Sequence, residues 1–276
     1  MGKKYLIVNA DDYNTDKERN RGIMQAAMEG IVTSVSVIAN LPFESEEVLN
    51  LQNVFGANIG IHLNLTKGRP LTAEAKTLIG NNGHFFEKRK AWQQALFRRY
   101  DLKEVEGEFA AQINHLKAAG ITPDHIDGNN HIHVFPGIAE VVGQLANDFG
   151  ISKIRLSLEA FNSWNNYCSP GAIRKSFIGT LSKRARMVFN NYSLRFPDHF
   201  AGIQFPRVSD VSSLRAFIGN FPEGTTELMC HPGYRNEREN RYSTGEREQE
   251  LLTLTNSGVL EDIKRFNITL ISFSGF

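Results

Sequence analysis

Strand-like and helix-like segments alternate along the whole chain, and this alternation limits the folds that it can adopt. The apolar run at residues 5–9 precedes a helical pattern at 19–29, and a β-branched run at 31–38 follows directly. Nearly continuous apolar strands separated by helices indicate a parallel sheet with both faces covered. Seven to eight such units in 276 residues favour an α/β fold, a single-domain distorted (β/α) barrel of parallel strands, over an open doubly wound sheet.

The rest of the chain continues this pattern, and we expect one domain over residues 1–276. Residues 66–90 are rich in Gly, Asn and Pro and form the longest predicted loop. Residues 160–197 contain no acids, so we expect a basic helical excursion around 162–196 that packs on the barrel with its basic face in water. The remaining predicted strands are 58–65, 124–128, 153–158, 201–205, 226–230 and 269–273, and the remaining predicted helices include 44–55, 102–119 and 172–190.

Composition and charge argue against several classes of protein. A net charge of +1 gives no reason to expect nucleic acid as a partner. The chain has no Gly-rich GxGxxG motif after a predicted strand, so a dinucleotide site is not expected. No apolar run approaches the roughly 20 residues that span a bilayer, and the start of the chain lacks the apolar stretch of a signal peptide. Cys168 and Cys230 are expected to be free thiols. These features predict a soluble, cytoplasmic protein.

Acids and histidines recur where the predicted strands end. Asp11 and Asp12 follow the first strand, His62 lies in the third, and Asp127 and His231 end two later strands. Because the chemistry of β/α barrels lies at the carboxyl ends of the strands, we expect these side chains to meet. Together they indicate one metal-centred active site.

The adjacent acids Asp11 and Asp12 have a structural and a functional interpretation. One of them can cap the next helix while the other lies in a solvated loop. Like charges this close repel, however, and a fold needs no such pair at a strand end. With His62 added, a hard divalent cation with oxygen and nitrogen ligands becomes the favoured interpretation, although His62 alone could be a core residue.

Residues 125–133 are the part of the chain densest in His and Asn. His131 and His133 are two residues apart, so on an extended backbone both side chains point the same way, an arrangement that metallohydrolases use to hold a metal. The alternative is a polar loop whose side chains bond the backbone. His231 precedes a Pro-Gly turn that would hold its imidazole over the barrel mouth, either as a general acid or as a structural loop residue.

Taken together, these motifs resemble those of the YdjC-like carbohydrate deacetylases. The opening motif of that family, Asn-Ala-Asp-Asp-aromatic, is present at residues 9–13. Residues 162–196 are less typical of the family. The later family motifs follow in order and at comparable spacing, at residues 30–36, 60–66, 68–70, 123–128, 131–133 and 227–232.

The resemblance implies a distorted β/α barrel that uses a divalent metal to remove an acetyl group from an N-acetylated amino sugar or chito-oligosaccharide. Mg²⁺ is the metal that we expect, and Zn²⁺ is the alternative. By position, Asp12 and His62 resemble two metal ligands, Asp11 resembles the catalytic base, and His231 resembles the proton donor to the leaving amine. The expected partner is a small carbohydrate. Deacetylases of this type often form dimers, and the sequence itself displays no interface.

Further residues are expected to contact the substrate. Arg155 stands at the end of the predicted strand 153–158, where its guanidinium could reach substrate oxygen atoms. His131 and His133, in the histidine-rich block, are expected to line the same site.

The chain departs from the family pattern at Asn129, where the family has a histidine as its third metal ligand. Asn offers a neutral carbonyl oxygen, which suits Mg²⁺ better than a transition metal. Three hypotheses stay open. In the first, the metal is held through Asn129 and water. In the second, the chain is a catalytically silent carbohydrate-binding or regulatory relative. In the third, the chain hydrolyses another bond, with His131 and His133 holding the metal.

Overall fold

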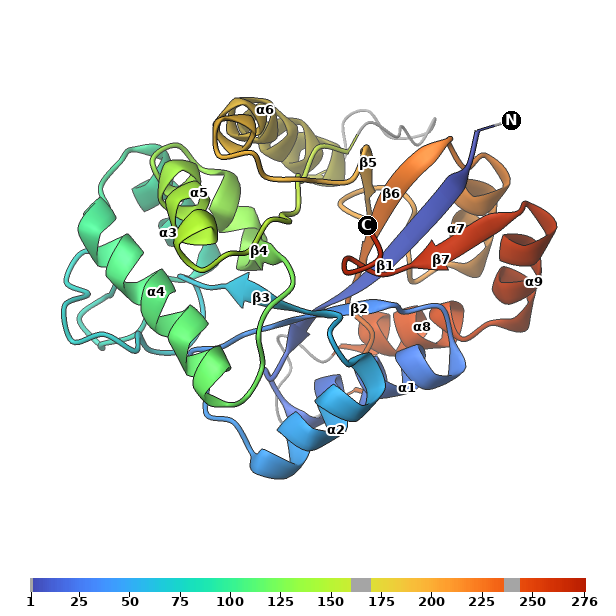
Figure 1. Ribbon diagram of the computed structural model, residues 1–276, viewed down its shortest axis with the longest axis horizontal. Coiled ribbons are helices and arrows are strands. Elements are labelled where there is room, and N and C mark those ends of the chain that lie inside the picture. Colours follow the sequence, from blue (N-terminus) through green and yellow to red (C-terminus); the bar gives the residue numbers. More distant parts are fainter. Residues whose placement is uncertain (1, 160–169, 236–243) are drawn as a thin grey trace.

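The computed structural model describes residues 2–159, 170–235 and 244–276, which form a curved parallel sheet with helices packed around it (Figure 1). The strand order is β4-β3-β2-β1-β6-β5, and β7 also pairs with β1. The prediction of a distorted (β/α) barrel of parallel strands is confirmed. The strands are β1 (Lys4–Tyr13), β2 (Ser34–Val37), β3 (Ile59–Leu63), β4 (Ile126–Gly128), β5 (His199–Ala201), β6 (Gly224–Cys230) and β7 (Ile268–Ile271).

Several helices begin where a short polar side chain accepts from a backbone N–H group of the first turn. Asp16 accepts from the N–H of Arg19 at the start of α1, and Asn256 accepts from two N–H groups at the start of α9. No helix in the described ranges is long and apolar enough to cross a bilayer. The helices are α1 (Lys17–Glu29), α2 (Ser45–Phe55), α3 (Lys88–Leu96), α4 (Leu102–Ala118), α5 (Ile138–Asp148), α6 (Pro170–Asn191), α7 (Val211–Gly219), α8 (Gly245–Leu254) and α9 (Ser257–Arg265), and η1 (Asn129–Val134) is a 3₁₀ helix.

Strand β1 crosses the middle of the sheet and pairs with β2, β6 and β7 (Figure 1). Its side chains Leu6, Val8 and Ala10 are completely buried in the core. Full burial of one aliphatic side chain the size of Leu or Val contributes about 1.5–3 kcal/mol, so β1 is firmly held. The two acids at its carboxyl end therefore stand on a rigid support.

The segment at residues 153–159 closes the gap between the edge strands β4 and β5. It forms isolated bridges to Ile126 of β4, to Arg195, and to Phe200 of β5. A continuous strand was predicted at 153–158, and this prediction is wrong, because the N–H of Leu158 bonds the carbonyl of Leu156 and turns the backbone away from strand geometry. The barrel is closed, but by an irregular segment.

The basic helix predicted at 172–190 is α6. Ile178, Leu181, Ala185 and Phe189 are buried at helical spacing, whereas Lys183, Arg184 and Arg186 are exposed. Ile173, near the start of this helix, is 67% exposed. Cys168, which was predicted to be a free thiol, lies outside the described residues. Cys230 is a buried free thiol.

The parallel register places the predicted site residues at one end of the sheet. His62 of β3 pairs with Asp127 of β4, and Ala10 of β1 pairs with Cys230, the residue before His231. Beyond Ala10 the pairing of β1 shifts register, and Asp12 adopts a positive φ of 70°. This irregularity turns Asp12 out of the strand toward His62.

Asn256→Ala is expected to lower the free energy of unfolding by about 1 kcal/mol, because the first turn of α9 loses its cap. Urea denaturation measures the change. Asn256→Asp keeps an acceptor oxygen and serves as the matched control. Equal losses in the two variants would contradict the capping role.

Candidate active site

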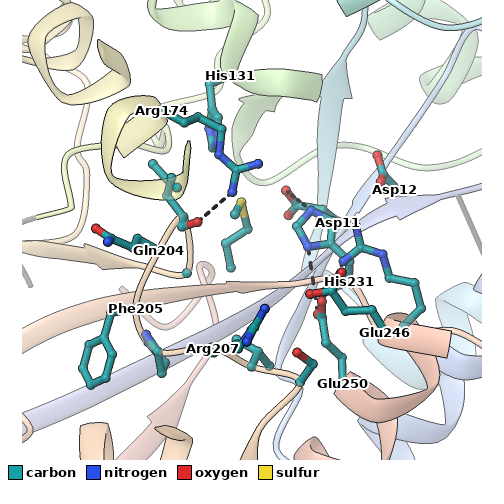
Figure 2. A pocket seen from close by; sticks show the side chains of 18 of the residues that line it. Asp11, Asp12, His131, Arg174, Gln204, Phe205, Arg207, His231, Glu246 and Glu250 are labelled. Atoms are coloured by element: carbon teal, nitrogen blue, oxygen red, sulfur yellow. Dashed lines mark hydrogen bonds and ion pairs between the residues drawn. The ribbon is translucent and has the colours of Figure 1, made fainter. Parts of the chain in front are cut away.

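The carboxyl ends of β1, β3 and β6 bring four of the predicted site residues together. His62 Nε2 lies 3.5 Å from Asp12 Oδ1 and 3.9 Å from Asp11 Oδ2. His231 Nε2 lies 3.9 Å from the same Asp11 oxygen. These side chains line a cavity of about 780 Å³ (Figure 2), a size typical of small-molecule sites.

The Asp11 carboxylate is held from two sides. Arg155 donates Nη1 to Oδ2 and Nη2 to Oδ1, both at 2.7 Å, and Asn9 Nδ2 donates to Oδ1 at 2.9 Å. A two-pronged guanidinium contact fixes both the position and the plane of a carboxylate. Asp11 is therefore oriented toward the cavity before any ligand arrives.

Arg155 itself does not reach the cavity. Its guanidinium is completely buried and also contacts Asp127 Oδ2 at 2.9 Å and Glu227 Oε1 at 2.6 Å. Burial opposes its charge, but the three carboxylates raise the pKa of Arg155 well above its usual value. The prediction that Arg155 contacts substrate is corrected accordingly, because its donors already bind Asp11, Asp127 and Glu227.

His62 has one nitrogen engaged and one directed toward Asp12. Its Nδ1 lies 2.7 Å from Asp127 Oδ1, and its Nε2 makes no hydrogen bond within the described ranges. Burial opposes a positive charge here, yet Asp127 and Asp11 raise the pKa of His62 to about 9. A carboxylate behind the ring is the arrangement that orients metal-binding histidines.

Asn129 directs its nitrogen, not its oxygen, toward Asp12. Its Nδ2 donates to Asp12 Oδ1 at 2.8 Å. Its Oδ1 accepts from Thr66 Oγ1, and from Asn130 Nδ2 at 2.6 Å. The amide oxygen is therefore occupied away from the position that a third metal ligand would take.

A divalent cation fits two of these side chains. Asp12 Oδ1 and His62 Nε2 are 3.5 Å apart, close to the separation of two ligand atoms on one cation. Burial alone would raise the pKa of Asp12, but Arg19 and His62 lower it. Asp127 belongs to a compact group with Asp11 and His62, but it contacts the opposite nitrogen of the ring.

His231 lies at the mouth of the site with 21% of its side chain exposed. Its backbone N–H donates to Glu250 Oε2 at 2.6 Å, which ties the end of β6 to α8. Burial, followed by the charges of Arg247 and Arg19, holds the pKa of His231 well below its usual value. The resting imidazole is therefore neutral at pH 7.

The paired histidines do not lie on an extended backbone. They are part of η1, in which Asn130 and His131 have positive φ angles of 54° and 59°. His131 Nδ1 contacts Ser157 Oγ at 2.9 Å and lines the cavity, whereas His133 is fully buried and contacts the carbonyl of Arg155. The expected common direction is wrong, and the two rings share no metal position with His62.

The cavity also has lining residues that the sequence did not single out as site residues. Glu250 and Arg247 come from α8, Lys88 comes from α3, and Arg174 comes from α6. Their charge was visible in the sequence, but they lie far from the motifs and only the fold brings them to the cavity. Arg174, expected on a solvated helix face, is exposed and also lines the cavity.

Comparison with known proteins defines the class. The family model described as YdjC-like protein matches residues 5–265, and the chain therefore belongs to this family. A carbohydrate deacetylase of Clostridium beijerinckii is 30% identical over 97% of this chain and 98% of its own length. The human carbohydrate deacetylase is 30% identical over 83% of this chain and 75% of its own length.

A solved structure supports the fold. It is that of an Enterococcus faecalis protein described in terms of cellobiose-phosphate cleavage, and it superposes with a TM-score of 0.79 at 23% identity. The match covers 99% of this chain and 98% of the other. The two proteins therefore share this fold along nearly the whole length of both chains.

Glu227 provides a test of the buried charges. Burial raises the pKa of Glu227 to about 7, although Arg155 opposes the shift, and its Oε2 has no partner in the described part of the chain. Since the folded state holds this proton more tightly than the unfolded chain, the contribution to stability is present below about pH 4.5 and declines as the pH rises to 7. In the unmodified protein the free energy of unfolding should fall by roughly 2–3 kcal/mol over this pH range, and Glu227→Gln should abolish this fall. Denaturant unfolding of the unmodified protein and of Glu227→Gln at several pH values measures the difference. Parallel plots of unfolding free energy against pH would contradict the prediction.

Proposed function

We propose that the protein is a metal-dependent hydrolase that removes the N-acetyl group from an acetylated amino sugar or chito-oligosaccharide. The observation that carries the proposal is the placement of Asp11 between His62 and His231, with His231 Nε2 and His62 Nε2 each 3.9 Å from Asp11 Oδ2. A carboxylate and an imidazole beside a cation position suit the hydrolysis of an amide. The names of the curated relatives, carbohydrate deacetylases, support the substrate class.

Asp12 and His62 would hold the divalent cation, with Mg²⁺ expected and Zn²⁺ as the alternative. When bound, the cation supplies Lewis-acid polarisation of the acetyl carbonyl and lowers the pKa of water. Asp127 keeps His62 in the required orientation through Nδ1. The chain's own part is to hold these donors rigidly.

Asp11 acts as the base and His231 delivers the proton. Asp11, fixed by Arg155, takes a proton from the attacking water. The imidazole of His231, whose Nε2 lies 3.9 Å from Asp11 Oδ2, takes up a proton once substrate is bound and passes it to the leaving nitrogen. The products are acetate and a free amino sugar.

Asp11→Asn should lower the rate of acetate release by about 10²–10⁴-fold while metal binding stays intact. Acetate release from N-acetylated chito-oligosaccharides and metal content are measured on the same preparation. Asp12→Asn is the contrasting variant and should lose metal. Wild-type turnover in Asp11→Asn would exclude Asp11 as the base.

A second candidate function is a catalytically silent carbohydrate-binding relative. The orientation of Asn129, with its N–H toward Asp12, favours this alternative. It predicts sugar binding without acetate release even at high Mg²⁺. The alternative metal clamp of His131 and His133 has no such support, because both rings bond to the segment 155–157.

Asn129→His decides between the two candidates. The added imidazole should tighten metal binding at least about tenfold, because it replaces an N–H donor with a ligand. Metal affinity is measured by calorimetry beside acetate release, with Asn130→His as the neighbouring control. An active, metal-loaded wild type supports the deacetylase, and an inactive wild type rescued by Asn129→His supports the silent relative.

A further inference from the structure

Strands β2 and β4 contact each other across β3 through a small side chain, that of Ser36. Ser36 lies on β2 and is completely buried, and the order of the sheet places β3 between β2 and β4 (Figure 1). Its parallel partner on β3 is Gly60, which has no side chain to separate the two strands. The Ser36 hydroxyl therefore reaches Asp127 of β4, to which it donates at 2.8 Å.

The space left by Gly60 also holds the imidazole of His125. A Cβ at residue 60 would lie 2.3 Å from His125 Cε1, so only glycine admits this ring against β3. His125 Nε2 lies 3.2 Å from Ser36 Oγ, and the imidazole stacks on the ring of Phe273 with the centroids 3.8 Å apart. Ser36 is thus enclosed in a closely packed interior, where its hydroxyl keeps fixed partners.

Asn9 connects Ser36 to the proposed base. Asn9 Nδ2 donates to Ser36 Oγ at 2.8 Å and to Asp11 Oδ1 at 2.9 Å. Both hydrogens of the amide therefore have an acceptor, which determines the direction in which the amide points. Asn9 Oδ1 has no partner in the described part of the chain, so the contacts of Nδ2 set the orientation of this side chain.

On its other side, Ser36 holds the acid that lies behind His62. Asp127 Oδ2 accepts from Ser36 Oγ and lies 2.9 Å from Arg155 Nη2. Asp127 Oδ1 lies 2.7 Å from His62 Nδ1. Arg155 belongs to the irregular segment 153–159, whereas Ser36 belongs to the regular strand β2. Ser36 therefore ties the Asp127 carboxylate to the sheet, and this carboxylate orients His62.

We propose that Ser36 is a positioning residue that couples the two halves of the site, the cation position at His62 and the base Asp11. This inference rests on the proposed function for the identity of both halves. Ser36 does not line the cavity, so it acts through Asp127 on one side and through Asn9 on the other. Removing an outer partner of this kind typically changes metal affinity or activity by about 10–100-fold.

Ser36→Ala should weaken the binding of Mg²⁺ and of Zn²⁺ by about tenfold or more, because Asp127 loses a donor that holds it behind His62. Calorimetry on the full chain measures the affinity for each metal alone, without substrate. Ser34→Ala is the matched control, because Ser34 lies on the same strand, is equally buried and accepts from the backbone N–H of Phe273.

The control separates positioning from general loss of stability. Urea denaturation measures the free energy of unfolding of Ser36→Ala and Ser34→Ala, and only Ser36→Ala should lose metal affinity. Unchanged affinity in Ser36→Ala would overturn the inference, and so would equal weakening in Ser34→Ala.

The proton between His62 and Asp127 gives a readout that needs no metal. In the metal-free protein, the contact of 2.7 Å should protect the Nδ1 proton of His62 from exchange with water. Ser36→Ala should raise this exchange rate by about tenfold or more, because local opening becomes easier, and Ser34→Ala should not change it. Proton NMR measures the rate, and His62→Gln identifies the signal by its loss. An unchanged rate in Ser36→Ala would contradict the positioning role.

Acetate release separates this inference from the proposed function. At saturating metal, Ser36→Ala should lower kcat for N-acetylated chito-oligosaccharides by about tenfold with KM unchanged, because Asp11 is held less firmly while the cavity wall is intact. Acetate release with equal kcat and equal metal affinity in Ser36→Ala sinks the inference and keeps the deacetylase. An unmodified protein that binds no metal and releases no acetate sinks the deacetylase, and faster ring-proton exchange in Ser36→Ala alone still supports the positioning role.

Discussion

A single buried guanidinium, that of Arg155, joins the carboxylates of three strands at the centre of the barrel. Asp11 comes from β1, Asp127 from β4 and Glu227 from β6. Removing charges from water costs several kcal/mol for each ion, and only close, multiple contacts offset that cost. Losing one partner of such a group typically costs about 3–5 kcal/mol. Because Arg155 belongs to the irregular segment that closes the barrel, closure of the fold and assembly of the site depend on the same contacts.

The contacts of Arg155 also help to hold the side chains at the proposed cation position. Asp127 contacts Arg155 with one oxygen and His62 Nδ1 with the other, and Ser36 Oγ also donates to it at 2.8 Å. His62 Nε2 is thereby directed at Asp12. The basic side chains of Lys88, Arg174 and Arg207 also line the cavity.

Much of the site could be predicted, and the errors have physical causes. That Asp11, Asp12, His62 and His231 lie together was predicted from strand ends alone, because parallel strands bring their carboxyl ends to one edge. His131 and His133 were misplaced because positive φ angles replaced the extended backbone with a 3₁₀ turn. Arg155 was expected at the substrate because a strand end was assigned there, and sequence spacing cannot reveal that three distant acids surround it.

The sequence by itself determined the barrel class, the family and the residues that meet at the strand ends. The alternation of strand-like and helix-like segments and the order of the motifs are local properties of the chain, which is why they could be recognised without the structure. Only the tertiary structure decided how those residues are partnered. The orientation of the Asn129 amide depends on Thr66 and Asn130. The position of Lys88 and Arg174 beside the cavity depends on how α3 and α6 pack. Distances and charge balance between segments far apart in the chain arise from packing, and no local pattern records them.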